Sequence, residues 1–543
     1  MPVHILLPSL KMRLRWYKVP DLVFATSTAR YIHPSFGLRY LKANLDHSLN
    51  KPDHVLTSEL IEFETVTPVE AVELLIKKAP KIVCFSVYIW NVEFIRKCAV
   101  LLRKIAPTMV ILCGGPEVQA LSLSDPLVES ANYIVRGEGE LIISPLVQFC
   151  LSNASKYTSR NISKDTSKHT TSNNSANSLE LLLSEVAKIN GKVINALPPD
   201  LSKVILPYYL YNEEDIKNRV IYVETGRGCP FNCHYCASSL DDGVRAFPLE
   251  SVLNEFEKLL ERGVFHFKFV DRSFNCEGGR AEQVLKFFLQ KYKEENKEFY
   301  LHFEFLPVRL SDSLKTLLKQ FPEKTLHIEV GVQTFSKEIG QRVGRTIPPL
   351  VVEETLKFLL NETKAIVHGD LIIGLPGDTV DSLSESFNKL WNLGVYEIQL
   401  NLLKCLGGTP LISHSDEFTM KYSDSPPYEV LSTSTMDFLT IRKLHECSRV
   451  FNMLCQSDNF PQVSRLIINA CNNPMESLFV FTDYILNAFG RSHHISLKVL
   501  LKAVFEYLTI DMKLSPAEAG RTIAADYYDN GRRKKLPWLE EKY

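Results

Sequence analysis

Residues 220–236 read VIYVETGRGCPFNCHYC and join an apolar, strand-like run to three closely spaced cysteines, Cys229, Cys233 and Cys236. Three thiolates on one short loop can hold three irons of a cubane cluster and leave the fourth iron open to a small molecule. A closed zinc site is the alternative, but it needs four ligands. His234 lies between two of the cysteines and is poorly placed to be the fourth. The spacing therefore favours an iron–sulfur cluster.

The composition is that of a globular protein with several domains. The chain has 543 residues, of which 45% are hydrophobic and 23% are charged. Its formal net charge is −1, so no overall field attracts nucleic acid or anionic lipid. The N-terminus lacks the features of a signal peptide, and no apolar run is long enough to span a membrane. Twelve thinly spread cysteines favour reduced thiols. We expect a cytoplasmic protein with no membrane span and no nucleic-acid partner.

Residues 1–150 alternate short apolar runs with segments of helical period. This pattern predicts a doubly wound, Rossmann-like α/β domain. The predicted strands are residues 3–7, 60–65, 81–88, 109–113 and 133–136, and predicted helices include residues 68–78 and 92–105.

The loops after the last three of these strands carry the candidate binding residues of this domain, because ligands of such sheets lie beyond the carboxyl ends of the strands. These residues are Ser86, Tyr88, Gly114, Gly115, Glu117, Arg136, Gly137 and Glu138. Adjacent glycines either close a tight turn or let the backbone approach a bulky ligand. Three such loops at one edge of one sheet favour a ligand crevice.

The rest of the chain divides into a linker, a barrel and a helical tail. Residues 151–200 are predicted to be a linker or insertion, since residues 152–178 are almost entirely polar, and residues 179–189 are predicted to be helical. Residues 201–415 alternate strands and helices as a partial (βα)6 TIM-type barrel does. Its predicted strands are 220–225, 264–270, 299–305, 325–332, 365–373 and 397–403, and its predicted helices are 249–261, 280–294, 312–320, 350–361 and 379–392. Residues 416–543 are predicted to form a mostly helical C-terminal domain, with 436–454 and 494–512 its clearest helices.

Polar residues and glycines fall where the barrel strands end. They include Asp271, Glu304, Glu329, Gln333 and Gly374. A barrel core can satisfy any one polar side chain internally. Their convergence on the edge that holds the cysteine loop favours an active site there.

With both halves in view, residues 1–415 resemble the cobalamin-binding-domain radical S-adenosylmethionine (SAM) family, and the helical tail resembles an accessory domain of some members. The resemblance rests chiefly on the three cysteines, with the aromatic Tyr235 before the last one. Supporting stretches are residues 270–275, EVGVQT at 329–334 and GDLIIGLPG at 369–377. The loops around Ser86, Gly114 and Arg136 match the cobalamin-domain pattern more loosely.

The resemblance implies cofactors and roles for individual residues. Cys229, Cys233 and Cys236 would hold a [4Fe-4S] cluster whose open iron binds SAM, and reductive cleavage of SAM would yield a 5′-deoxyadenosyl radical. Residues implied near SAM are Tyr235, Asp271, Glu304, Gln333, Arg345 and Gly374. The eight strand-end residues of the first domain would contact cobalamin, which donates a methyl group in much of the family.

Two departures limit the resemblance. The loop after the predicted first strand has no Asp-x-His-x-x-Gly motif, so the lower ligand of cobalt is unassigned. In addition, Asp271-Arg272-Ser273 stands where many members have Gly-Gly-Glu, and Asp271 is our candidate partner for the amino group of SAM.

The leading hypothesis is a cobalamin-dependent radical SAM enzyme that methylates a carbon atom of a small molecule or biosynthetic intermediate. A radical rearrangement or cyclisation without methyl transfer is the alternative within enzymes, and a non-catalytic metal-binding interaction protein is the alternative outside them. The enzyme hypothesis implies an electron donor such as flavodoxin or ferredoxin. The substrate is not readable from the sequence.

Overall fold

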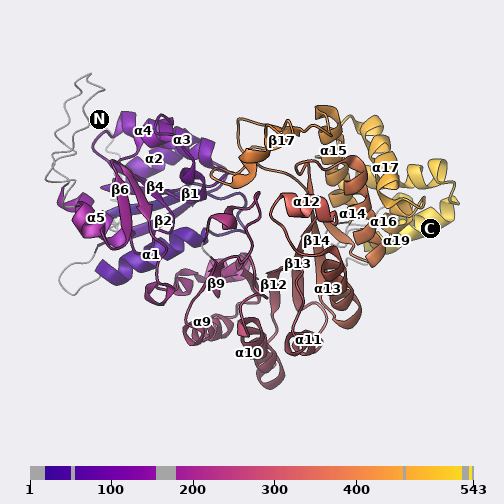
Figure 1. Ribbon diagram of the computed structural model, residues 1–543, viewed down its shortest axis with the longest axis horizontal. Coiled ribbons are helices and arrows are strands. Elements are labelled where there is room, and N and C mark those ends of the chain that lie inside the picture. Colours follow the sequence, from indigo (N-terminus) through magenta and orange to yellow (C-terminus); the bar gives the residue numbers. More distant parts are fainter. Residues whose placement is uncertain are drawn as a thin grey trace, which may run out of the picture. The chain divides into compact units, whose positions relative to one another are not determined.

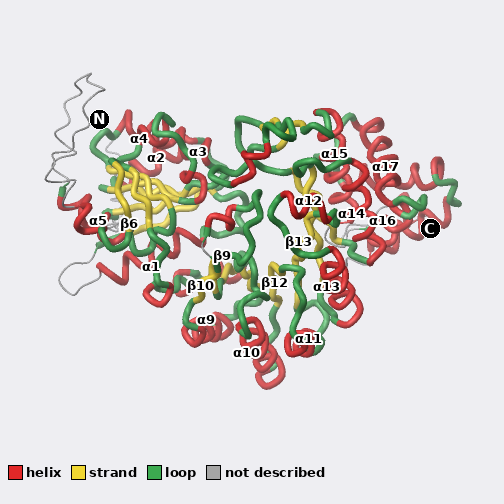
Figure 2. The backbone as a smooth tube through the Cα atoms, in the orientation of Figure 1, coloured by secondary structure: helices red, strands yellow, loops and turns green. Residues whose placement is uncertain are grey.

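The computed structural model describes residues 19–49, 56–153, 179–241, 243–455, 460–528 and 537–540. The chain forms two compact units, Met1–Leu210 and Tyr211–Tyr543. Each unit is built on its own parallel or mostly parallel sheet with helices packed around it, and the elements can be followed in Figure 1 and Figure 2. The predicted strand at residues 3–7 and the polar stretch 154–178 lie outside the described residues.

The sheet of the first unit has the strand order β2-β1-β3-β4-β5-β7-β6, and only the pairing of β6 with β7 is antiparallel. Its strands are β1 (Leu22–Ser27), β2 (Ser58–Phe63), β3 (Ile82–Ser86), β4 (Val110–Gly114), β5 (Tyr133–Arg136), β6 (Ala187–Asn190) and β7 (Val193–Ala196). Its α-helices are α1 (Phe36–Leu49), α2 (Pro68–Lys78), α3 (Val92–Ile105), α4 (Pro126–Ser130) and α5 (Ile143–Ser152).

Both faces of this sheet are buried. Val23 and Ala25 of β1 join one core with residues of α2, α3 and α4, whereas Leu22 and Phe24 join a second core with residues of α1 and α5. Because successive side chains of a strand point to opposite faces, this division requires helices on both sides of the sheet. The predicted doubly wound fold is confirmed.

Strands β2 to β5 and helices α2 and α3 match the sequence prediction closely, but three strands were not predicted. The order of the strands reverses at β1, which lies between β2 and β3. The sequence prediction assigned no strand or helix to the residues of β1. The helix predicted for residues 179–189 is wrong, because only residues 179–183 are helical and Ala187 begins β6. Gly191, at φ +61°, turns the chain from β6 into β7. The Asn190-Gly191 pair is a hairpin signal that the helix prediction overlooked.

The second unit contains a six-stranded parallel sheet in the order β15-β14-β13-β12-β11-β8. Its strands are β8 (Ile221–Val223), β11 (His266–Phe269), β12 (Tyr300–Phe305), β13 (Leu326–Gln333), β14 (Ile366–Ile373) and β15 (Glu397–Leu402). The helices between and before them are α8 (Glu213–Asn218), α9 (Leu249–Glu261), α10 (Arg280–Glu295), α11 (Asp312–Leu318), α12 (Lys337–Arg342), α13 (Pro349–Glu362) and α14 (Val380–Leu393). All six predicted strand–helix units are present, and a small hairpin of β9 (Gly226–Gly228) and β10 (Val244–Ala246) leads into and out of the cysteine loop.

The C-terminal part of this unit is helical, as predicted. It consists of α15 (Phe438–Cys455), α16 (Pro461–Ile468), α17 (Pro474–Phe489), α18 (Leu497–Glu506), α19 (Pro516–Tyr528) and α20 (Pro537–Glu540), preceded by the short strands β16 (Lys421–Tyr422) and β17 (Val430–Ser432). The Trp391 indole of α14 donates to the Asn469 side chain at 2.8 Å, and the Ser448 hydroxyl of α15 donates to the Leu400 carbonyl of β15 at 2.6 Å. These bonds join the helical part to the barrel. Among the described residues, no helix is both long and apolar enough to cross a membrane.

Candidate functional site

The cysteine loop leaves the barrel after β8, and backbone hydrogen bonds on both sides of His234 fix its middle. The His234 N–H donates to the Val343 carbonyl at 2.9 Å, and the His234 carbonyl accepts from the Leu411 N–H at 3.0 Å. Cys229 and Cys233 are buried, and Cys236 is half-buried. The loop therefore presents three thiols from a backbone that the barrel itself holds in place.

Asp271 anchors the start of this loop. Its carboxylate accepts hydrogen bonds from the Thr225 hydroxyl at 2.6 Å, the Thr225 N–H at 3.0 Å and the Gly226 N–H at 2.8 Å. Burial raises the pKa of Asp271 to about 7 although these bonds act in the opposite direction. In this structure the carboxylate holds the turn between β8 and β9, and its contact with SAM stays a prediction.

Arg345 brings a positive charge to the thiols. Its Nη1 atom lies 3.9 Å from the Cys233 sulfur, and its Nη2 atom donates to the Gly331 carbonyl of β13. Burial raises the pKa of the Cys229 thiol, the neighbouring Cys233 and Cys236 raise it further, and Arg345 lowers it. Three thiols that influence one another, beside a buried guanidinium, suit an anionic iron–sulfur cluster with three protein ligands.

Other residues predicted near SAM lie on the same barrel strands. Gln333 ends β13 at a bulge and has φ +69°, a strained conformation for a residue with a side chain. Glu304 of β12 forms an ion pair with Arg272 at 2.9 Å. Gly374 follows β14 at φ +86°, and a Cβ atom there would lie 2.8 Å from Val430. Tyr235 is half-buried between the second and third cysteines. These positions are compatible with a site at the carboxyl ends of the strands, and their individual roles stay predictions.

The first unit has a comparable edge where the strand order changes direction between β1 and β3. Asn91 joins the two strands there, because its Nδ2 group lies 2.9 Å from the Thr26 hydroxyl, 3.0 Å from the Ser27 carbonyl and 3.3 Å from the Ser86 carbonyl. Thr26 and Asn91 were not predicted as site residues. The sequence did not predict β1, and the carboxyl end of β1 forms one side of the switch point, so these two residues could not be placed there.

The predicted binding loops of the first unit surround this edge. The Tyr88 ring stacks on Trp90 at 4.4 Å, and Trp90 is 56% exposed. Gly115 has φ +112°, and a Cβ atom on it would lie 2.5 Å from the Val87 carbonyl oxygen. Glu117 lies in the short helix η1 (Pro116–Gln119), which Arg136 holds by donating to the Val118 carbonyl at 3.2 Å and the Leu121 carbonyl at 2.8 Å. Gly137 has φ +88°, and Glu138 beside it is half-buried. Arg136 thus shapes the loop after β4, whereas Trp90 leaves a flat aromatic surface accessible.

Replacing Asn91 by alanine is expected to destabilise the first unit by about 1–3 kcal/mol, because it removes several hydrogen bonds from a side chain that is 2% exposed. Urea unfolding of the full chain measures the effect. The matched change Asn195→Ala, on an exposed residue of β7, is expected to alter stability by less than about 0.5 kcal/mol. Equal effects of the two changes would contradict a role of Asn91 in joining β1 and β3.

Residues 223–390, which contain the cysteine loop and the barrel strands β11 to β14, match the model of the radical SAM superfamily. These residues form a radical SAM domain. Its C-terminal residues 416–543 match a family described as a protein of unknown function, DUF4080.

Two curated proteins and one solved structure are similar to this chain over longer stretches. The uncharacterized methyltransferase PH0819 of Pyrococcus horikoshii is 25% identical over 329 residues, which cover 57% of this chain and 63% of that protein. The anaerobic magnesium-protoporphyrin IX monomethyl ester cyclase of Cereibacter sphaeroides is 22% identical over 295 residues, covering 53% of this chain and 45% of the cyclase. The chain thus spans less than two thirds of each of these relatives. The structure of the cobalamin-dependent S-adenosylmethionine radical enzyme OxsB has a TM-score of 0.58 at 14% identity and covers 96% of this chain and 83% of its own. At that identity the likeness concerns the fold.

Proposed function

We propose that this radical SAM enzyme binds cobalamin and methylates a carbon atom of a small molecule or biosynthetic intermediate. The observation that carries the proposal is that one chain combines two kinds of domain. One is a barrel whose three-cysteine loop lies within the radical SAM match, and the other is a doubly wound sheet with the predicted binding loops at its switch point. The fold shared with OxsB over nearly the whole chain supports cobalamin as the second cofactor. The relative named as a methyltransferase supports methyl transfer.

In the barrel, Cys229, Cys233 and Cys236 would hold a [4Fe-4S] cluster. When bound, the cluster would supply an electron that cleaves the sulfonium of SAM, and the resulting 5′-deoxyadenosyl radical would abstract hydrogen from an unreactive carbon. The chain's own residues position these groups. Arg345 places positive charge beside the thiolates, and Asp271 fixes the turn from which the cysteine loop begins. We propose that Tyr235, Glu304, Gln333 and Gly374 contact SAM.

In the first unit, the eight strand-end residues predicted from the sequence would surround the corrinoid. The Gly114 carbonyl accepts from the Val87 N–H at 2.8 Å, and the lack of a Cβ atom at Gly115 lets the backbone after β4 lie close to Val87. The stacked Tyr88 and Trp90 offer a flat apolar face. Such a face suits the planar ring of a corrinoid. An electron donor of the flavodoxin or ferredoxin type would supply the reducing electron.

A radical cyclisation without methyl transfer is the second candidate. The similarity to the anaerobic magnesium-protoporphyrin IX monomethyl ester cyclase favours it, since that relative is aligned over about half of this chain. The radical SAM match disfavours the non-catalytic alternative. Substrate identity is not assigned by either candidate.

One anaerobic experiment tests the proposal and separates the candidates. Protein reconstituted with iron and sulfide is incubated with SAM and a reductant, and the products are measured by chromatography. We expect 5′-deoxyadenosine, and corrinoid extractable from the purified protein. S-adenosylhomocysteine formed together with it indicates methyl transfer, whereas its absence with a true substrate indicates cyclisation. An intact cluster that gives no 5′-deoxyadenosine would refute both enzyme candidates, and protein that neither retains nor takes up corrinoid would refute the cobalamin assignment.

Arg345 also yields a prediction about the cluster itself. Removing its charge with Arg345→Gln is expected to shift the midpoint potential of the cluster to a more negative value, because a nearby positive charge favours the reduced state. Anaerobic redox titration followed by electron paramagnetic resonance measures the shift. Arg309→Gln, which removes an exposed arginine of the same unit, is the control and is expected to leave the potential unchanged. An unchanged potential in Arg345→Gln would exclude this electrostatic role.

A further inference from the structure

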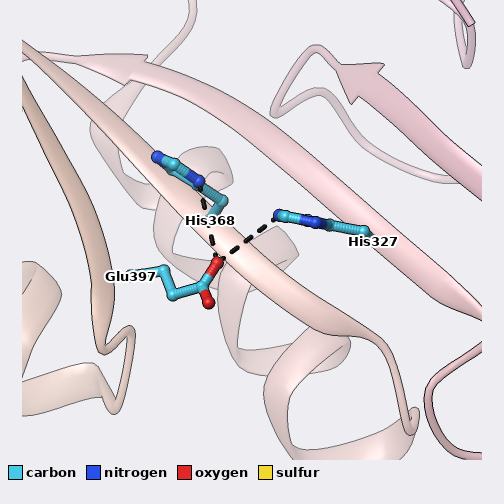
Figure 3. Close-up of side chains that lie close together, drawn as sticks. All are labelled: His327, His368 and Glu397. Carbon is cyan, nitrogen blue, oxygen red and sulfur yellow. Dashed lines mark ion pairs between the residues drawn. The ribbon is translucent and has the colours of Figure 1, made fainter. Parts of the chain in front are cut away.

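Three metal-binding side chains meet at the N-terminal ends of neighbouring barrel strands. His327 is the second residue of β13, His368 is the third of β14, and Glu397 is the first of β15. His368 and Glu397 are direct partners in the register between β14 and β15. Figure 3 shows the two imidazole rings and the carboxylate converging on one point from these strands.

The distances within the cluster suit one metal ion better than direct hydrogen bonds. The Glu397 Oε2 atom lies 3.5 Å from His327 Nε2 and 3.8 Å from His368 Nδ1, and the three ligand atoms all lie within 4.8 Å of one another. Both N···O distances are longer than an ordinary N–H···O hydrogen bond. A tetrahedral site with metal–ligand bonds of about 2.1 Å has edges of about 3.4 Å. Small side-chain rotations are therefore enough to bring the three atoms onto one ion.

The opposite ring nitrogen of His327 has a partner that can set the tautomer that metal binding needs. The Tyr300 hydroxyl lies 2.7 Å from His327 Nδ1, whereas His368 Nε2 lies 3.6 Å from the Asp370 carboxylate and has no hydrogen-bond partner among the described residues. A proton on each of these nitrogens leaves a lone pair on His327 Nε2 and on His368 Nδ1. Metal-binding histidines commonly have such a partner on the other nitrogen. His327 has this arrangement, since Tyr300 lies at its other nitrogen.

The cluster is partly buried, with His368 buried and His327 and Glu397 half-buried. His368 is 8% exposed, and the Nε2 atom of His327 is buried without a hydrogen-bond partner among the residues that the structure describes. The His302 ring stacks on His327 with centroids 4.2 Å apart and an angle of 7° between the planes. His302 is itself held by Glu329 at 2.6 Å, and Glu329 contacts Lys268 at 3.4 Å. His302, Glu329 and Lys268 thus hold one face of the His327 ring in place.

The cluster lies at the opposite end of the barrel from the cysteine loop. Arg345, which contacts Cys233, reaches β13 at Gly331, and Gln333 ends the strand. At about 3.3 Å per residue, His327 is roughly 20 Å from Gln333 along β13. In barrels of this kind chemistry occurs at the carboxyl ends of the strands, whereas the N-terminal ends contribute to stability.

We propose that His327, His368 and Glu397 bind one divalent transition-metal ion of the Zn²⁺ class. Two imidazoles and one carboxylate are ligands that Zn²⁺ accepts in proteins, with water in the fourth position. The ion joins β13, β14 and β15, and β15 is an edge strand of the sheet. Its role is to fix this edge. The proposal is independent of the function proposed for the cysteine loop.

The test uses the full chain with its cysteine loop reconstituted with iron and sulfide, so that the thiols are occupied. The protein is incubated with Zn²⁺, freed of unbound metal and analysed by mass spectrometry of the metals. We expect wild type to retain one zinc more than Glu397→Gln or His368→Ala, and Zn²⁺ to raise the Tm of wild type only. The control His493→Ala removes an exposed histidine of the helical part and is expected to retain the zinc.

Two further measurements keep the test decisive if a ligand variant fails to fold. Tyr300→Phe preserves the ring and removes the hydroxyl beside His327, and we expect it to weaken Zn²⁺ binding by about 10–100-fold. Co²⁺ as a spectroscopic probe is expected to show ligand-field absorption without thiolate charge transfer. Equal zinc content in wild type and Glu397→Gln would overturn the proposal. Thiolate charge transfer would place the metal on cysteines and would overturn it as well.

Discussion

Cys233→Ala is expected to abolish cluster binding and the formation of 5′-deoxyadenosine. Cys233 is the middle cysteine of the loop, is 6% exposed and lies beside the buried Arg345. Its loss leaves two thiolates, which cannot hold three irons of a cubane cluster. Iron and acid-labile sulfide analysis, anaerobic absorption spectra and chromatography of the nucleoside products measure the effect. Each signal is expected to fall to the level of protein that was not reconstituted.

The matched control is Cys276→Ala. Cys276 is half-buried in the loop after β11, close enough to Cys229 for the two thiols to affect one another, and is not one of the three spaced cysteines. This variant is expected to keep the cluster and the activity, while Cys233→Ala keeps any corrinoid bound to the first unit. A cluster retained in Cys233→Ala would contradict the assignment of the ligands. Loss of corrinoid together with the cluster would contradict separate cofactor sites in the two units.

The sequence revealed those parts of the fold that bury a continuous apolar run or one helical face. Strands β3 and β4 are continuous apolar runs, and β12 and β14 contain shorter buried runs, whereas β11, β13 and β15 alternate buried with more exposed side chains. The exact bounds of α2, α3 and α9 follow from their apolar period. Strands β6 and β7 are short and alternate buried with exposed side chains such as Lys188 and Asn195, next to a polar segment. Their place in the sheet depends on the pairing of β7 with β5, which is distant in the sequence, so local sequence does not predict it.

The same distinction applies to the sites. The cysteine loop is local, so its spacing and the family resemblance together predict an iron–sulfur site. By contrast, His327, His368 and Glu397 come from three strands and have no common spacing, and each looks like an ordinary polar residue in a barrel core. The one sequence signal is the polar alternation along β13, where His327 and Glu329 lie on the same face of the strand. The register between β13, β14 and β15 brings the three residues together, and only the structure shows this register.

Gly228→Ala is expected to prevent assembly of the cysteine loop. Gly228 immediately precedes Cys229, has φ +91°, and pairs with Val244 in the β9–β10 hairpin. A Cβ atom there would lie 2.0 Å from the Gly243 carbonyl oxygen, which is a backbone atom and cannot rotate away. The strain of a left-handed alanine, about 1–2 kcal/mol, adds to an overpacking effect of about 1–3 kcal/mol. We expect the variant to lose cluster binding and about 2–5 kcal/mol of unfolding free energy.

Gly263→Ala separates the two contributions. Gly263 has φ +87°, but a Cβ atom on it would meet nothing within 4 Å, so only the backbone strain remains. Denaturant unfolding is expected to show a loss of about 1–2 kcal/mol for Gly263→Ala, with a normal iron content after reconstitution. The difference between the two variants measures the clash with Gly243. If Gly228→Ala binds the cluster as well as Gly263→Ala does, the hairpin tolerates movement, and the close approach of Gly228 to Gly243 is not what positions Cys229.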